Sequence, residues 1–211
     1  MGHMVEDVLR EQGIECAGAT EDVVNFDKAL AKESVCIDFT TPAAFRANYR
    51  ALAQNFKAVV VGTTGWQDIA DEVIGCFEQC GTPMIYASNF SIGVNVTFAI
   101  MELAARKLAG AGYTPSIVET HHIHKLDAPS GTAASMAKIV EQGIGQQVPI
   151  ESRRIGEVPG THELTLLSGC DKITITHEAF SRMGFAQGAV RAAVLTEGLQ
   201  GVHEFKDLIL D

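Results

Sequence analysis

Three histidines and a lysine lie within five consecutive positions and give the strongest sign of chemistry in the chain. They are His121, His122, His124 and Lys125. Histidine titrates near neutral pH and suits proton transfer, while lysine donates a proton or holds a carboxylate. Shortly afterwards, Ser130-Gly131-Thr132 opens an alanine-rich stretch, a pattern typical of a helix start, where free N–H groups bind anions. Residues 117–132 thus combine proton donors, a fixed cation and a carboxylate cradle.

The geometry of this segment allows three interpretations of its histidines and lysine. Residues 117–120 favour a strand, in which His121 and His122 face opposite sides and cannot share one task. A loop after the strand can bring Lys125 back to His121, and Asp127 can orient either side chain. The alternatives are histidines with a purely structural role, or a metal site built on His121 and His124, for which no further ligand is clearly placed. We therefore expect acid–base and cation roles and no metal.

The composition limits the class of protein. The 211 residues carry a formal charge of −10, with 46% hydrophobic and 20% charged residues, as in a globular chain with a substantial core. This charge argues against binding to nucleic acid or to anionic membranes, so an anionic substrate requires a local basic patch such as residues 121–125. No signal peptide or membrane-spanning apolar run is recognisable, and we expect a cytoplasmic protein.

Strands and helices alternate in the first half of the chain. Strands are predicted at 14–20, 35–40, 58–61 and 83–86, and helices at 1–12, 42–56, 68–80 and 94–108. Such alternation predicts a parallel sheet with helices on both faces. The second half changes to an antiparallel hairpin, 162–168 with 172–177, followed by a helix at 184–199 and a final strand at 205–210. We expect an α/β fold in which an α+β domain interrupts the first domain.

Three of the predicted strands end in small polar loops. The loops are Phe39-Thr40-Thr41, Gly62-Thr63-Thr64-Gly65 and Ala87-Ser88-Asn89. Ligands of open α/β sheets bind at the carboxyl ends of the strands, which favours a shared crevice, although these residue types also form ordinary turns.

Arg191, in Gly188-Ala189-Val190-Arg191, is either a surface cation or a ligand for a phosphate or carboxylate.

The segment from Glu119 to Ala133 resembles the signature of the bacterial 4-hydroxy-tetrahydrodipicolinate reductase family, also called dihydrodipicolinate reductase. Further matching motifs occur in the same order along essentially the whole chain: Asp38-Phe39-Thr40, Val61-Gly62-Thr63-Thr64-Gly65, Ser88-Asn89-Phe90-Ser91-Ile92-Gly93-Val94-Asn95, Ser181-Arg182 and Gly188-Ala189-Val190-Arg191. The resemblance implies a Rossmann-like dinucleotide-binding domain, 1–91 with 191–211, and a substrate-binding and oligomerisation domain, 92–190. It also implies NADPH- or NADH-dependent reduction of a cyclic imine dicarboxylate in the diaminopimelate–lysine pathway by a homotetramer.

The resemblance also assigns expected roles to individual residues. His121 is expected to be the catalytic acid–base and Lys125 the proton donor. His122, Ser130, Gly131 and Thr132 are expected to bind the substrate carboxylates. The cofactor is expected to contact Phe39, Thr40, Gly62, Thr63, Thr64, Ala87, Ser88, Asn89, Phe90 and Arg191.

One departure from the family pattern concerns the phosphate-binding loop. The family begins with a strand and a glycine-rich turn, and Met1-Gly2-His3 is similar only to the end of that pattern. We therefore expect these 211 residues to bind the dinucleotide weakly or not at all, and a non-catalytic dinucleotide- or dicarboxylate-binding protein is the alternative function. A metal-dependent hydrolase is a more distant alternative.

Overall fold

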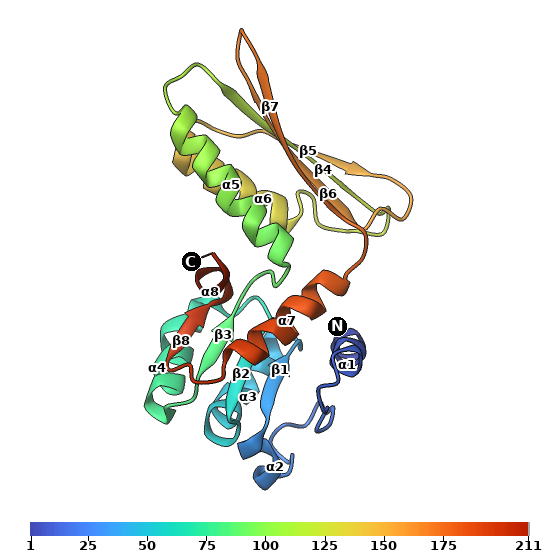
Figure 1. The fold of residues 1–211 in the computed structure, drawn as a ribbon, viewed down its shortest axis with the longest axis vertical. Coiled ribbons are helices and arrows are strands. Elements are labelled where there is room, and N and C mark those ends of the chain that lie inside the picture. The colour runs from blue at the N-terminus through green and yellow to red at the C-terminus, as the bar shows by residue number, and fades with distance from the viewer. Residues whose placement is uncertain (211) are drawn as a thin grey trace. The chain divides into compact units, whose positions relative to one another are not determined.

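A computed structural model describes residues 1–210 of the chain (Figure 1). The chain divides into two compact units, Met1–Ser91 with Phe185–Asp211, and Ile92–Gly184. The first unit is built from two separate parts of the sequence, and the second comes from the stretch between them. The α/β fold class predicted from the sequence is confirmed, while the functional assignment of each domain stays a prediction.

The first unit contains a parallel four-stranded sheet, sheet A, in the order β1-β2-β3-β8. The strands are β1 (Val35–Asp38), β2 (Ala58–Val61), β3 (Met84–Tyr86) and β8 (Val202–Glu204). β2 has four consecutive buried residues, because both of its faces are covered. Parallel pairing in register places the carboxyl ends of β1, β2 and β3 at one edge.

Helices cover both faces of sheet A. On one face, Val59 and Val61 pack with residues of α3 (Pro42–Asn55) and α4 (Ala70–Cys80). On the other face, Val60 packs with α7 (Met183–Leu195), whose residues from Phe185 onward belong to this unit, and with α8 (Phe205–Ile209). The unit also contains α1 (Gly2–Glu11), α2 (Lys28–Glu33) and a short 3₁₀ helix, η1 (Gln67–Ile69).

Two predicted strands of the first unit are wrong. Residues 14–20 are exposed and irregular, because no strand of the described chain pairs with them and an unpaired segment does not form a stable strand. At the other end, the strand is Val202–Glu204, and Phe205 instead begins α8 with its ring fully buried. The apolar residues after Phe205 serve one face of a helix rather than a strand.

The second unit contains a mixed four-stranded sheet, sheet B, in the order β5-β4-β6-β7. The strands are β4 (Thr114–His121), β5 (Ile150–Arg154), β6 (Gly160–Leu167) and β7 (Lys172–Ala179). β4 pairs with β5 in parallel and with β6 in antiparallel fashion, and β6 pairs with β7 as the predicted hairpin. The sequence did not predict β5.

Helices α5 (Ile92–Leu108) and α6 (Gly131–Ile144) form the core of this unit with one face of sheet B. Ile117 and Leu164 are opposite each other on β4 and β6, and both pack against Met101 of α5 and Met136 of α6. These helices therefore fix the orientation of β4, which leads into the histidine-rich segment. No helix among residues 1–210 has the length and apolar character needed to cross a membrane.

Candidate active site

The packed face of β4 changes from apolar to polar along the strand. Its inward positions are Pro115, Ile117, Glu119 and His121, all buried, with Glu119 at 0% and His121 at 8% exposure. A carboxylate almost never occupies such a position unless it is paired. The alternation that builds the core thus delivers an acid and an imidazole to the end of the strand.

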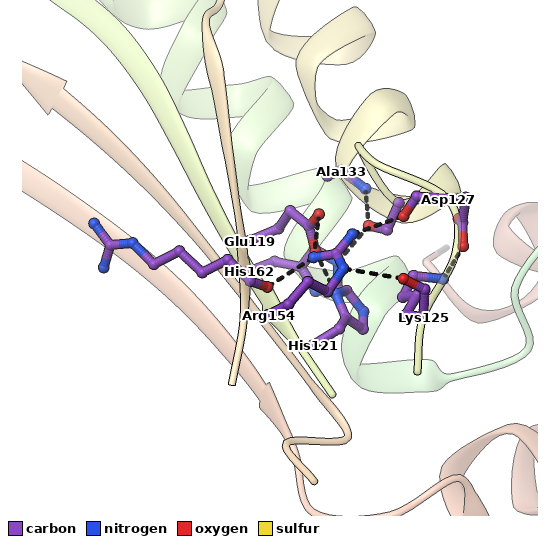
Figure 2. Close-up of polar contacts among 9 residues, drawn as sticks. Glu119, His121, Lys125, Asp127, Ala133, Arg154 and His162 are labelled. Atoms are coloured by element: carbon purple, nitrogen blue, oxygen red, sulfur yellow. Dashed lines mark hydrogen bonds and ion pairs between the residues drawn. The ribbon is translucent and has the colours of Figure 1, made fainter. Parts of the chain in front are cut away.

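Glu119 and His121 form a buried pair. The Nδ1 atom of His121 is hydrogen-bonded to Glu119 Oε2 (Figure 2). A carboxylate on this side favours the tautomer with the proton on Nδ1, which leaves Nε2 as the nitrogen able to accept a proton. Gly160 lies beside that atom, and a Cβ at this position would come within 3.0 Å of Nε2. Glycine therefore keeps the Nε2 side of the ring free of a neighbouring side chain.

The pKa values of Glu119 and His121 are both lowered, for different reasons. Burial alone would raise the pKa of Glu119, but hydrogen bonds from Ser152, Arg154 and His121 outweigh it and lower the pKa. Burial also lowers the pKa of His121, with Lys125 and Arg154 acting in the same direction and Glu119 opposing them. At neutral pH the pair is a carboxylate beside a neutral imidazole.

Lys125 lies in the loop that follows β4. Its Nζ is 2.8 Å from Asp127 Oδ1, and the ammonium lowers the pKa of Asp127 through this hydrogen bond (Figure 2). Asp127 therefore orients Lys125, one of the two roles that the sequence left open. The side chain of Lys125 is 23% exposed, so it stays accessible from solvent.

Ser130 caps α6 from a buried position. Its Oγ accepts a hydrogen bond from the N–H of Ala133 at 3.1 Å and lies 3.2 Å from Nε2 of His162. The helix start predicted at Ser130 is confirmed, and Gly131 and Thr132 form its first turn. The backbone N–H of Gly131, in the first turn of this helix, is among the groups that lower the pKa of Asp127.

The other two histidines of the motif differ in their surroundings. His122 is partly buried, and its Nδ1 has no hydrogen-bond partner among the described residues. The His124 side chain is 68% exposed and reaches Glu157 on the surface, with 3.2 Å between Nε2 and Oε1. Nowhere in residues 1–210 do three or more His, Cys, Asp or Glu side chains gather in a way that could hold a metal ion.

Three residues of this site, Glu119, His162 and Arg154, were not predicted as site residues from the sequence. The register places His162 opposite Glu119 on β6, and its ring packs edge-on against His121 at 5.1 Å between centroids. The predicted hairpin could have indicated His162, because on a strand this histidine shares the inward face with Leu164. Arg154 lies on β5, whose short run of polar residues gave no sign of a strand.

In the first unit, the polar loops after β1 and β2 meet as expected. The N–H of Thr40 donates to Oγ1 of Thr63 at 2.8 Å. The ring of Phe39 covers Gly62 so closely that a Cβ there would lie 2.1 Å from Phe39 Cε1. Thr64 is exposed beside them. The two strand ends thus form one continuous polar edge.

Asp38 lies at the carboxyl end of β1 with a buried, unsatisfied oxygen. It is 6% exposed, Oδ2 has no hydrogen-bond partner within the described part of the chain, and burial raises its pKa although Thr40 and Thr63 oppose this. An acceptor left in this state is suited to a ligand hydroxyl or amide. In the sequence, Asp38 was recognised as part of a strand and of the Asp38-Phe39-Thr40 motif, without a role of its own.

The remaining residues expected at the cofactor lie after β3 and on α7. Ala87, Ser88 and Asn89 form the loop after β3, and Phe90 is buried with its ring against Phe39 and Phe205. Arg191 is exposed on α7. The structure therefore brings the first two loops together directly and joins the third through the rings of Phe90 and Phe39.

Burial of His162 predicts a pH-dependent stability. Burial lowers the pKa of His162 to about 4, with the charge of His121 adding to the effect, whereas an unfolded histidine titrates near about 6.5. Between these values the unfolded chain binds the extra proton, so the free energy of unfolding falls as the pH decreases, by about 3 kcal/mol in total. Urea unfolding at about pH 7 and about pH 4.5 measures this.

The matched variants are His162→Gln and His124→Gln. His162→Gln is expected to reduce the pH dependence, while the exposed His124→Gln leaves it unchanged. Equal pH dependence in wild type and His162→Gln would contradict the assignment of this loss of stability to His162.

The parallel sheet A, its helices on both faces and its polar strand ends define a Rossmann-like α/β protein carrying a second, α+β unit. Among solved structures, a dipicolinate-bound dihydrodipicolinate reductase from Paenisporosarcina sp. TG-14 matches with a TM-score of 0.71 at 23% identity, over 82% of this chain and 72% of that one. An engineered D-amino acid dehydrogenase bound to NADP⁺ matches with a TM-score of 0.54 at 13% identity, over 100% and 92%. These likenesses confirm the fold.

Sequence comparison defines the family. The family descriptions "Dihydrodipicolinate reductase, N-terminus" and "Dihydrodipicolinate reductase, C-terminus" match residues 2–90 and 93–209. The chain is 37% identical to a 4-hydroxy-tetrahydrodipicolinate reductase of Christiangramia forsetii, over 100% of this chain and 94% of the relative. It is 39% identical to that of Chromohalobacter salexigens, over 90% and 77%. The chain belongs to the dihydrodipicolinate reductase family.

Proposed function

We propose that this protein is a reductase that converts 4-hydroxy-tetrahydrodipicolinate to tetrahydrodipicolinate with NAD(P)H, in the diaminopimelate–lysine pathway. The observation that carries the proposal is the buried Glu119–His121 pair beside Lys125 and the capped start of α6, in a chain of this family. Substrate and product differ by one hydroxyl oxygen, so the reaction consumes one hydride and one proton and releases water. A dicarboxylate substrate also explains a basic pocket in a protein of net charge −10.

His121 and Lys125 are the proposed proton-transferring groups. Glu119 holds the proton of His121 on Nδ1, so that Nε2 faces the substrate as acid or base. Lys125, oriented by Asp127, supplies a proton or neutralises charge that develops on the ring.

The substrate carboxylates have two proposed binding places. The N–H groups of Gly131 and Thr132, with the Ser130 hydroxyl, hold one at the start of α6. His122, whose Nδ1 has no hydrogen-bond partner among the described residues, holds the other. Such contacts fix the ring of the substrate relative to His121.

The cofactor is NADPH or NADH, which supplies the hydride when bound. The polar edge formed by Thr40 and Thr63 fits a dinucleotide, because parallel strand ends expose such groups and Asp38 Oδ2 has no hydrogen-bond partner within residues 1–210. The remaining proposed contacts are Phe39, Gly62, Thr64, Ala87, Ser88, Asn89, Phe90 and Arg191. Titration with NADPH measures cofactor binding separately from turnover.

Family membership across both halves of the chain disfavours the alternative of a non-catalytic binding protein. The decisive experiment follows NADPH and NADH oxidation with freshly generated 4-hydroxy-tetrahydrodipicolinate, with and without a chelator. We expect substrate-dependent oxidation that is insensitive to the chelator. Absence of turnover at saturating cofactor would refute the proposal, and loss of turnover with chelator would favour a metal-dependent reaction.

We further propose a cytoplasmic homotetramer. The face of sheet B turned away from α5 and α6 carries half-exposed residues such as Val118 and Thr165, and Leu167 is 52% exposed. Pairing of such faces between copies would bury these side chains. Sedimentation velocity at several concentrations measures the oligomeric state.

A further inference from the structure

Arg154 is the last residue of β5 and lies next to the acid–imidazole pair. The parallel register of β4 and β5 places it opposite His121. Its side chain is only 21% exposed, although arginine normally keeps its charged group in water. A guanidinium held this close to the end of β4 requires partners, and it has them on three segments of the chain.

The guanidinium of Arg154 donates in several directions at once (Figure 2). Its Nη1 is 2.9 Å from Oε1 of Glu119 and 2.7 Å from the carbonyl of Arg153. Its Nη2 donates to the carbonyl of Asp127 at 2.6 Å, and Nε donates to the carbonyl of Lys125 at 3.3 Å. One planar group therefore joins the carboxylate behind His121 to the backbone of the loop that carries Lys125.

We propose that Arg154 is a positioning residue that holds both proton-transferring side chains in place. Through Glu119 it fixes the ring of His121, and through the two carbonyls it fixes the loop from Lys125 to Asp127. The proposal rests on the proposed function of His121 and Lys125. A misplacement of about 1 Å in such groups costs on the order of 100-fold in rate, so one shared clamp has a large effect.

Charge neutralisation of Glu119 is the competing explanation for Arg154. A lysine would serve that purpose, because a single ammonium near the carboxylate is enough. Only the planar fork of arginine reaches the carboxylate and both carbonyls simultaneously. Arg154→Lys therefore separates positioning from simple charge compensation.

The test compares Arg154→Met, Arg154→Lys and the control Arg153→Met. Arg153 is the neighbour on β5, with a half-exposed side chain whose Nε is 2.8 Å from Glu151 Oε1. We expect kcat to fall about 100-fold in Arg154→Met and to remain well below wild type in Arg154→Lys, with smaller changes in KM. Arg153→Met keeps wild-type kcat. Wild-type kcat in Arg154→Lys would overturn the proposal. This result decides the question even if Arg154→Met fails to fold.

A spectroscopic measurement makes the test independent of turnover. In ¹⁵N-histidine-labelled protein, the two ring nitrogens of His121 report its tautomer and its titration. With Arg154→Lys we expect signals of mixed tautomers, because Glu119 is no longer fixed, whereas Arg153→Met retains the wild-type signals. Unchanged His121 signals in Arg154→Lys would overturn the positioning proposal, whether or not the wild type is active. A wild type without reductase activity would contradict only the proposed function.

Discussion

His121→Ala is expected to lower kcat by about 10²- to 10⁴-fold, with a much smaller change in KM for the substrate. In the proposed function the imidazole exchanges a proton at Nε2 and takes no part in the carboxylate contacts, so its removal is expected to affect the chemical step. Lys125→Ala is expected to lower kcat by a similar factor and to raise KM as well, because the ammonium also attracts an anionic substrate. Steady-state oxidation of NADPH at varied substrate concentration measures both constants.

His124→Ala is the matched control for these variants. His124 belongs to the same motif but pairs with Glu157 on the surface, so its loss is expected to leave kcat within a factor of about two. Wild-type turnover in both His121→Ala and Lys125→Ala would exclude the proposed proton transfers. A large loss in His124→Ala would show that the whole loop, rather than individual side chains, governs the rate.

Gly188→Ala is expected to cost about 3 kcal/mol or more of the free energy of unfolding. A Cβ at this position of α7 would lie 1.7 Å from the carbonyl oxygen of Phe90, which is backbone and cannot rotate away. Either α7 or the loop after β3 has to move. Urea unfolding measures the loss, and NADPH binding is expected to weaken in parallel, because the displaced loop belongs to the proposed cofactor edge.

Gly75→Ala provides the control. Gly75 also lies inside a helix, α4, but a Cβ there meets no atom within 4 Å. Alanine favours the helix relative to glycine, so we expect a gain of about 0.5–1 kcal/mol. If Gly188→Ala were as stable as wild type while Gly75→Ala behaved as expected, the close packing of α7 on Phe90 would be refuted.

The sequence predicted those elements whose pattern and partners are local. β2 is a continuous apolar run, and α3 has Thr41 as its cap and Pro42 at its first position, so both were correctly placed. The motif from Glu119 to Ala133 predicted a strand, a loop and a helix start, all of which are present. In each case the residues themselves carry the signal, in their spacing or their capping chemistry.

The errors and omissions depend on partners distant in the sequence. Residues 14–20 were predicted as a strand, but no strand within residues 1–210 pairs with them, whereas β5 is a strand because β4 pairs with it. For the same reason, Arg154 and His162 were missed as members of the site. Their proximity to His121 follows from the register between strands, which no local pattern in one sequence specifies.

The face of sheet B that packs against α5 and α6 changes from apolar to polar side chains along its strands. Stability and the proposed active site can therefore be engineered at different positions of this face. Around Ile117 and Leu164 that face belongs to the core, so volume-conserving substitutions there adjust thermal tolerance. Glu119 and His162, which pair two residues away on β4 and β6, occupy the equivalent positions on this face, where the same substitutions would disrupt the proposed active site. A directed-evolution library restricted to the apolar positions around Ile117 and Leu164 can therefore search for higher thermal stability, while Glu119 and His162 keep their wild-type identity.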